Sequence, residues 1–252
     1  MQMSVIGTIR TCFSEKFGVP RQPGMVPSAW GTIRISPEFA PPESELRLES
    51  FSHVWVLFVF DRAKTPFHPQ DWAATVQTPG NGAPKRVGVY ASRSPHRPNP
   101  IGMSVLKLES VRRDADQSLC LEVSGVDLLD RTPILDLKPY VPYADRVDAA
   151  TAGWTLPDSK SYAVSFGPGV EAELSEWAKS EKFNGRPLIS LVHETLASDP
   201  RPRSQREDAP AEDPSSVGRA FAFRMLGLDF HWRIVEGPRF ELVRIERLPA
   251  GR

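Results

Sequence analysis

The side chains best suited to binding a ligand lie close together in residues 88–104. Three prolines in this stretch fix their own backbone angles and keep the preceding residues out of the helical region, so the chain is rigid before anything binds. The hydrogen-bond donors on it are Arg93, His96, Arg97 and Asn99. A rigid loop that presents several donors is typical of a binding site, although a solvated proline-rich turn has a similar composition.

This loop must be positioned by the strands on either side of it. We expect one strand at residues 86–90, leading into the loop, and another at residues 103–113, leaving it. The second strand is predicted to form a hairpin with residues 119–126. Gly88 and Gly102 lie at the ends of the loop, where the lack of a side chain leaves room for a close approach to the backbone.

The remainder of the first half is also predicted to be mainly strand. Further strands are expected at residues 4–10, 30–35 and 51–60. A short helix is expected at residues 41–48, and Asn81-Gly82 marks a turn within a loop at residues 63–85. Many short strands without alternating helices indicate a mainly β fold, with an antiparallel β-barrel as an N-terminal domain at residues 1–145.

The second half differs because it contains amphipathic helices. Helices are predicted at residues 169–183 and 187–197, and strands at residues 161–166, 219–226, 229–235 and 240–248. These elements indicate a small α+β domain at residues 146–252. Between them, residues 198–206 are predicted to be a proline-locked loop, and the acidic, proline- and serine-rich residues 207–216 are predicted to be mobile.

Charge and composition exclude several classes of protein. The chain has 31 Lys and Arg residues and 31 Asp and Glu residues, so an RNA partner would need a local basic patch. No apolar run has the length of a membrane span, and the N-terminus lacks the features of a signal peptide. Cys12 and Cys120 have no metal-type spacing and are expected to be reduced and partly buried. We therefore expect a soluble, cytoplasmic protein without a membrane segment.

Three carboxylates, Asp127, Asp130 and Asp136, interrupt an apolar segment that is again stiffened by prolines. A metal site is not expected, because no histidine or further acid lies at ligand spacing. Binding the hydroxyls of a sugar fits these residues better, since an ionised aspartate is purely an acceptor.

Four motifs in this order resemble those of the TsaA/TrmO family of tRNA adenosine N6-methyltransferases, and the resemblance extends over essentially the whole chain. The motifs are Pro-Arg-Gln-Pro-Gly at 20–24, Ser-Arg-Ser-Pro-His-Arg-Pro-Asn-Pro-Ile-Gly at 92–102, Asp-Leu-Leu-Asp-Arg-Thr-Pro-Ile at 127–134 and Asp-Pro-Arg-Pro at 199–202. The resemblance implies a β-barrel that binds S-adenosylmethionine and works as a homodimer. The implied reaction methylates N6 of threonylcarbamoyladenosine beside the anticodon of threonine tRNA.

The resemblance also implies roles for individual residues. Cofactor contacts are assigned to Pro20, Arg21, Gln22, Asp61, Arg62, Arg93, Met103, Asp127, Leu128, Leu129 and Asp130. Contacts with the tRNA or the acceptor base are assigned to Arg201 and Arg203 and to His96, Arg97 and Asn99, although the last three residues would equally serve to brace the loop or to face a partner subunit. In the family an aromatic residue often follows the fourth motif, whereas this chain has Arg203 and Ser204. This difference argues against base stacking by that loop but not against phosphate contact.

Proton removal is the step that the protein must assist. The carbonyl on N6 makes this nitrogen a poor nucleophile and its proton more acidic, so a carboxylate is the expected acceptor. Asp130 and Asp199 are the candidate catalytic residues, and capping a turn is the alternative role for either of them. Two other functions stay open, namely a binding module for S-adenosylmethionine or RNA without catalysis, and a methyltransferase acting on another substrate.

Overall fold

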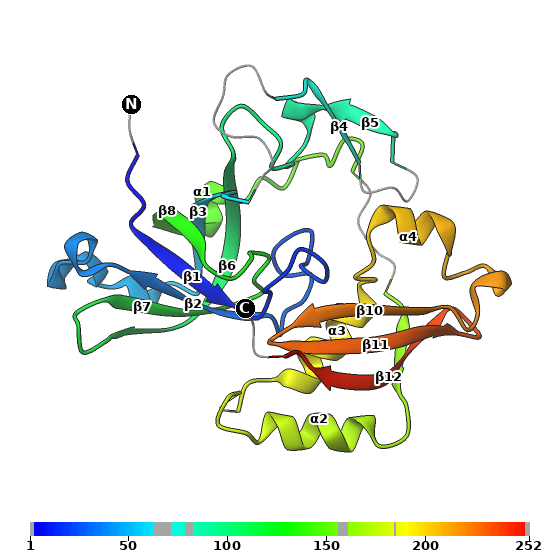
Figure 1. Cartoon of the computed structure of the whole chain (residues 1–252). Helices are drawn as coiled ribbons and strands as arrows, with labels where there is room; N and C mark the ends of the chain where they lie inside the picture. Colours follow the sequence, from blue (N-terminus) through cyan, green and yellow to red (C-terminus); the bar gives the residue numbers. More distant parts are fainter. Residues whose placement is uncertain (1–2, 63–71, 79–82, 156–160, 184, 250–252) are drawn as a thin grey trace. The chain divides into compact units, whose positions relative to one another are not determined.

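The computed structural model describes residues 3–62, 72–78, 83–155, 161–183 and 185–249 (Figure 1). Two compact units divide the chain, and both of them are discontinuous in sequence. The first unit comprises Met1–Arg10, Thr32–Val123 and Arg131–Ser159, and the second comprises Thr11–Gly31, Ser124–Asp130 and Lys160–Arg252. Each unit is described by itself below.

Six strands form a closed antiparallel barrel, which confirms the predicted mainly β fold. In their order around the barrel, the strands are β1 (Gly7–Thr11), β2 (Trp30–Ile35), β7 (Leu119–Ser124), β6 (Ile101–Arg113), β3 (His53–Val59) and β8 (Thr132–Pro139). Closure leaves no unpaired strand edge that could recruit another chain.

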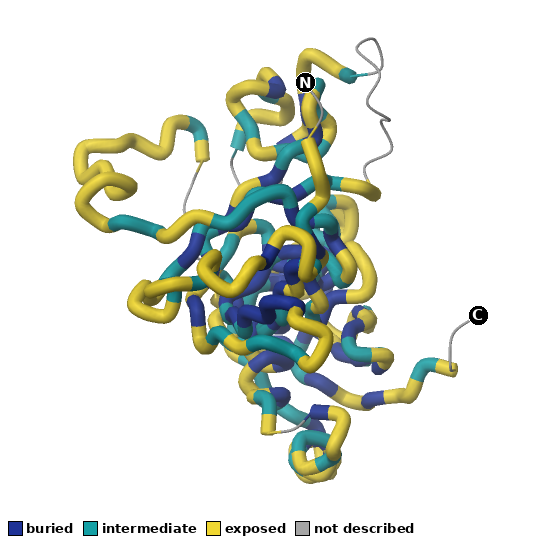
Figure 2. Tube along the Cα trace, turned by 90° about the vertical axis from the view of Figure 1, so that its left-hand side faces the viewer, coloured by how far each residue is buried: buried dark blue, intermediate teal, exposed yellow. Residues whose placement is uncertain are grey.

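The barrel core follows the alternation of the strands. In β3, Val54, Val56 and Phe58 are buried, whereas the intervening residues are only half-buried. This period of two places every second side chain inside the barrel. Figure 2 shows the resulting alternation of buried and less buried residues along the chain.

Strand β8 closes the barrel and was not predicted from the sequence. It pairs with β1, where Gly7 lies opposite Ile134, and with β3, where Phe58 lies opposite Ile134. Prolines at both ends of β8 made the segment look like another stiff loop. A register shift between Leu57 and Phe58 accommodates the strand against β3.

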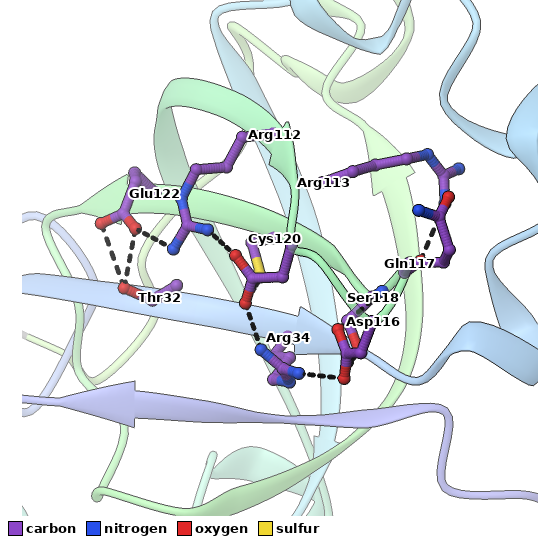
Figure 3. Close-up of polar contacts among 10 residues, drawn as sticks. Thr32, Arg34, Arg112, Arg113, Asp116, Gln117, Ser118, Cys120 and Glu122 are labelled. Carbon is purple, nitrogen blue, oxygen red and sulfur yellow. Dashed lines mark hydrogen bonds and ion pairs between the residues drawn. The ribbon is translucent and has the colours of Figure 1, made fainter.

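The predicted hairpin of β6 and β7 is confirmed, and a network of charged side chains holds its turn (Figure 3). Asp114 is paired with both Arg34 and Arg112, and Asp116 is also paired with Arg34. The Sγ of buried Cys120 donates to the Asp114 carboxylate at 3.3 Å. The network ties the turn to the neighbouring strand β2, which carries Arg34.

Short turns complete the first unit. The helix predicted at residues 41–48 is wrong, because two 3-10 turns occupy that region, each only one turn long, in a segment containing two prolines. The 3-10 turns are Pro37–Phe39, Pro42–Glu45, Leu48–Ser50 and Val89–Ala91, and a short helix α1 spans Pro142–Asp145. Strands β4 (Thr75–Gln77) and β5 (Arg86–Gly88) form a separate two-stranded sheet. The predicted turn at Asn81-Gly82 lies outside the described residues.

The second unit contains a four-stranded sheet and three helices, as the predicted α+β composition requires. The strands, in sheet order, are β10 (Ala220–Met225), β11 (Leu228–Val235), β12 (Arg239–Arg247) and β9 (Ala163–Phe166). The helices are α2 (Val170–Ala178), α3 (Leu188–Ala197) and α4 (Arg203–Asp208), with a 3-10 turn at Pro214–Ser216. Helix α2 ends before its predicted limit, because the chain turns at Ser180–Phe183 to bury Phe183.

Residues 207–216, which were predicted to be mobile, include structured and buried parts. Helix α4 begins inside the predicted loop and continues to Asp208, and the two alanines after it, Ala209 and Ala211, are buried. The Glu212 carboxylate accepts a hydrogen bond from the hydroxyl of Tyr162 at 3.0 Å. The composition of this segment did not indicate the packing, because the apolar residues that it buries are only two small alanines.

Candidate functional site

The predicted cofactor residues belong to segments that join barrel strands at one end. Neighbouring strands are antiparallel, so β1, β7 and β3 run in one direction and β2, β6 and β8 in the other. Residues 20–24 lie in the connection after β1, residues 127–130 in the connection after β7, and residues 61–62 directly after β3. The loop at residues 92–100 leads into β6 at the same end.

In the first unit, the end of β3 and the start of β6 bring part of the predicted set together. The backbone N–H of Phe60 donates to the carbonyl of Pro100 at 2.8 Å, which places Asp61 beside the rigid loop. Met103 lies opposite Leu57 in the register and is 50% exposed. The Asp61 carboxylate is 3.8 Å from Nε of Arg62.

Inside the rigid loop, Arg97 has a bracing contact. Its Nη1 donates to the carbonyl of Ser92 at 3.0 Å, and the Ser92 hydroxyl donates to the carbonyl of Val89 at 2.8 Å. The backbone N–H of His96 donates to the Ser94 hydroxyl at 3.2 Å. The side chains of Arg93, His96 and Asn99 are exposed.

In the second unit, the first and third motifs lie against each other. The backbone N–H of Gly24 donates to the carbonyl of Gly125 at 2.9 Å. Gly125 has a φ of +72°, and a Cβ there would lie 3.3 Å from the Cα of Gly24, so both the conformation and the contact favour glycine. Pro20 and Leu128 are buried, and Arg21, Asp127 and Leu129 are half-buried, whereas Gln22 is exposed.

Asp130 is part of this backbone arrangement. Its Oδ1 accepts a hydrogen bond from the N–H of Thr11 at 3.0 Å, and its own N–H donates to the carbonyl of Phe13 at 2.7 Å. The Thr11 hydroxyl donates to the carbonyl of Leu128 at 2.9 Å. One carboxylate oxygen of Asp130 therefore has a structural partner, which supports the turn-capping alternative.

A contact that the sequence did not indicate fixes the connection between β1 and β2. The Glu194 carboxylate accepts hydrogen bonds from both the N–H and the hydroxyl of Ser28, each at 2.8 Å. Glu194 belongs to α3, whose other residues near it are largely buried. An acid among apolar residues on a predicted helix was the available signal for such a partner.

The fourth motif forms a buried ion pair. Nε and Nη2 of Arg201 donate to the two carboxylate oxygens of Asp199, both at 2.7 Å, and Nη1 donates to the carbonyl of Ala209 at 2.7 Å. Asp199 is 5% exposed and Arg201 is 4% exposed. The guanidinium also lies over the ring of Phe221, 4.8 Å from its centroid. In this geometry the guanidinium of Arg201 binds the carboxylate of Asp199. The contact of Arg201 with tRNA stays a prediction.

Beside this motif is a pocket of about 340 Å³ within the second unit. It is lined by Glu15, Phe17, Pro200, Arg201, Pro202, Gln205, Ala222, Phe223, Arg224, Asp229 and Trp232. Hydrogen bonding to Asp229 raises the pKa of the Arg224 guanidinium. Oδ1 of Asp229 is buried and has no hydrogen-bond partner among the described residues, so this unsatisfied acceptor is covered rather than open to the pocket.

Arg203, a predicted tRNA contact, and two further arginines of the second unit are paired with carboxylates. Arg203 donates to Glu207 at 2.6 Å, one turn further along α4. Arg219 is paired with Asp208 and Arg233 with Glu241, each at 2.6 Å. Over the described residues, no group of three or more His, Cys, Asp and Glu side chains could hold a metal ion. None of the described helices is long and apolar enough to span a membrane.

Comparison with known proteins identifies the family. The N-terminal domain of tRNA-methyltransferase O matches residues 8–146, and the C-terminal domain of TrmO matches residues 159–248. The chain therefore belongs to the tRNA-methyltransferase O (TrmO) family.

Individual relatives match along almost the whole chain. A tRNA (adenine(37)-N6)-methyltransferase of Escherichia coli K12 is 36% identical, covering 97% of both chains. A Pseudomonas aeruginosa protein, RcsF, named as an S-adenosylmethionine-dependent methyltransferase, is 39% identical and covers 99% of this chain and 98% of its own length. The crystal structure of TrmO from Pseudomonas aeruginosa matches with a TM-score of 0.74 and 35% identity, covering 98% of both chains.

Proposed function

We propose that this chain transfers a methyl group from S-adenosylmethionine to N6 of adenosine 37 in tRNA. The observation that carries this proposal is the match to the Escherichia coli tRNA (adenine(37)-N6)-methyltransferase along 97% of both chains. We further propose that the acceptor is threonylcarbamoyladenosine in threonine tRNA, as the family resemblance implies. The enzyme would act in the cytoplasm as a homodimer, with the domain boundary near residue 146.

The residues at the barrel end fit the chemistry of the cofactor. S-adenosylmethionine carries a carboxylate, a ribose diol and an adenine ring, and when bound it supplies an electrophilic methyl group. Arginines suit the carboxylate, aspartates suit the diol, and apolar walls suit the ring. The cofactor contacts that we propose are Pro20, Arg21, Gln22, Asp61, Arg62, Arg93, Met103, Asp127, Leu128, Leu129 and Asp130. The close packing of Gly24 on Gly125 supports this set by holding its two second-unit segments in fixed positions.

For the acceptor, the pocket beside the fourth motif is our candidate site. Aromatic walls at Phe17 and Phe223 suit a planar base. We retain Asp130 and Asp199 as candidate proton acceptors, and Arg203, His96, Arg97 and Asn99 as candidate tRNA contacts beside Arg201. The role of the protein is to orient N6 and to accept its proton.

The test is a methylation assay with purified chain, S-adenosylmethionine and threonine tRNA, read by mass spectrometry of the nucleosides. We expect methylated threonylcarbamoyladenosine from tRNA that carries the threonylcarbamoyl group, and none from unmodified tRNA. Methylation of unmodified adenosine 37 would contradict the finer substrate assignment. Binding of the cofactor without methylation of either tRNA would favour a binding module, and methylation elsewhere would favour another substrate.

A further inference from the structure

Positive charge is concentrated in one stretch, although the chain as a whole is neutral. Between Trp72 and Leu108 there are five Lys and Arg residues and no Asp or Glu residue, against 31 of each class in the whole chain. The rest of the chain therefore has five more acidic than basic residues. Such segregation produces a local field that the net charge does not reveal.

Two of the five basic side chains of this stretch, Arg86 and Arg97, have neutral partners in the first unit, whereas Lys107 is paired with the Glu109 carboxylate at 2.9 Å. Arg86, in β5, donates through Nε and Nη2 to the Thr75 hydroxyl at 3.0 and 2.6 Å, and through Nη2 to the Thr75 carbonyl at 3.2 Å. Arg97 donates to the carbonyl of Ser92. Lys85 precedes Arg86 and is exposed. The bonds of Arg86 and Arg97 orient these two side chains without neutralising them, because each acceptor is uncharged.

The basic residues of the second unit provide a contrast. Arg219 and Arg233 each have a carboxylate oxygen at 2.6 Å, and Arg224 has one at 3.2 Å. A paired arginine contributes little to the attraction of an anion. These three arginines are therefore a weaker candidate for an anion-binding surface than the basic residues of the β4–β5 region.

An exposed aromatic ring lies in the same region as these charges, in contact with a second, half-buried ring. Tyr90 is 75% exposed, and its ring centroid is 6.1 Å from that of Trp72, at an interplanar angle of 48°. The turn that carries Tyr90 is fixed, because Nε1 of Trp154 donates to the carbonyl of Ala91 at 2.8 Å and the N–H of Val89 donates to the carbonyl of Ala74 at 2.9 Å. A large aromatic ring held rigidly in solvent can stack on a base without a further loss of backbone entropy.

We propose that Trp72, Lys85, Arg86, Tyr90 and Arg97, here called the hairpin surface, bind an unpaired segment of RNA. Figure 1 shows β4 and β5, which carry part of this surface, as a pair of strands separate from the barrel strands. Lys85, Arg86 and Arg97 contact phosphates, and Tyr90 stacks on a base that is not paired. Unneutralised cations together with an exposed aromatic ring suit single-stranded RNA better than an acidic protein, which offers no bases to stack. The inference rests on the proposed function, in which the substrate is a tRNA.

Two sets of variants test the hairpin surface, with tRNA binding measured as Kd against salt concentration. The double variant Lys85→Ala, Arg86→Ala should weaken binding about tenfold and lower the slope of log Kd against log salt by about 1.5, as expected for two lost phosphate contacts. Tyr90→Ala should weaken binding about fivefold to a hundredfold with little change in slope, whereas Tyr90→Phe, which keeps the ring, should bind like the unaltered chain.

The matched control is the double variant Arg146→Ala, Lys179→Ala. It changes the net charge by the same amount at side chains that are 72% and 71% exposed but paired with carboxylates. Its binding should stay within about twofold of the unaltered chain. S-adenosylmethionine affinity, measured by calorimetry, should be unchanged in every variant, which checks that each protein is folded.

Unchanged tRNA affinity and slope in both the Lys85, Arg86 variant and Tyr90→Ala would overturn the hairpin surface. An equal loss in the control variant would also overturn it, because the effect would then come from net charge alone. Failure of the proposed function is a separate result, namely that the unaltered chain does not methylate tRNA. A hairpin surface that bound an acidic protein instead would leave tRNA affinity intact in all variants, which again contradicts the inference.

Discussion

At the scale of single residues, the Asp199–Arg201 pair is the clearest case in which geometry bears on a proposed catalytic role. Both carboxylate oxygens of Asp199 accept hydrogen bonds from Arg201, and both side chains are almost completely buried. Removing either partner of such a pair destabilises the fold strongly, because the other charge is then left buried and unpaired. The same bonds restrict its use as a proton acceptor.

Asp199→Asn should therefore lower the free energy of unfolding by about 3 kcal/mol, as is typical for a broken buried ion pair. Urea denaturation measures this loss. The control is Glu207→Gln, which removes the partner of Arg203 at a side chain that is 60% exposed and should cost at most about 0.5 kcal/mol. If the stability of Asp199→Asn is unchanged but its single-turnover rate is lost, Asp199 acts as a catalytic base rather than through the pair.

A second residue-scale prediction concerns pH. Burial raises the pKa of the Cys12 thiol to about 12 from 9.0, so this thiol stays protonated in the folded chain while it ionises in the unfolded chain. The unfolded state then binds fewer protons, and stability falls as pH rises through the window from about 9 to about 12. The stability difference between the unaltered chain and Cys12→Ala should shift against the unaltered chain by about 1.4 kcal/mol between pH 8 and pH 10. A difference that stays constant over this range in denaturation experiments would contradict the assignment.

At the scale of secondary structure, the two glycines that flank the rigid loop have different roles. Both were predicted to allow a close approach to the backbone. A Cβ at Gly102 would lie 2.2 Å from the ring of Phe58, which is buried in the barrel, whereas no atom lies within 4 Å of a Cβ at Gly88. A close approach to the backbone is thus observed at Gly102, whereas at Gly88 it stays a prediction, because the space beside this extended residue, with φ at −59° and ψ at 145°, is open.

Gly102→Ala should consequently destabilise the pairing of β3 and β6 by about 1–3 kcal/mol, because the buried ring of Phe58 has to move. Gly88→Ala is the matched control at the other end of the loop. It should be neutral or stabilising by up to about 1 kcal/mol, since alanine reduces the conformational freedom of the unfolded chain. Thermal unfolding of the two variants measures both effects, and equal melting temperatures would show that the ring of Phe58 relaxes without cost.

The helices and strands that the sequence predicts correctly are those whose hydrophobic periodicity is uninterrupted. Strands β2, β3, β6 and β7, helix α3 and the three strands β10–β12 all follow from periodicity and turn signals. Strand β8 was missed because proline content dominated the interpretation, and α4 was missed because most of it lies in residues 198–206, which were predicted to be a proline-locked loop. The motifs of the site were found from the sequence, but the contact between Ser28 and Glu194 was not, because a contact between polar groups far apart in the chain leaves no periodic signal. The Asp199–Arg201 pair is local, and it was missed because each residue was assigned a separate functional role.

At the scale of the whole molecule, the order of the chain does not match its compact units. The connections at Thr11–Gly31 and Ser124–Asp130 arise from barrel strands but belong to the same unit as Lys160–Arg252. Ser28 bonds to Glu194, and the N–H of Leu226 donates to the carbonyl of Cys12 at 3.1 Å. A cut between the two matched family domains therefore removes partners from segments that carry seven of the eleven proposed cofactor contacts.

We expect a fragment of residues 1–155 to be much less stable than the whole chain. Without residues 160–252, Ser28 loses both of its carboxylate bonds, and the buried side chains of Cys12, Phe13 and Val26 lose the rest of their compact unit. Thermal unfolding followed by circular dichroism should show a melting temperature lower by about 10 °C or more, since 1 kcal/mol corresponds to about 4–8 °C for a domain of up to about 100 residues and somewhat less for this longer fragment. Full-length Glu194→Gln, which weakens only the bonds to Ser28, should lie between the two proteins. A fragment that melts cooperatively at the temperature of the whole chain would show instead that residues 1–155 fold independently and that the connections need no partner from the second half.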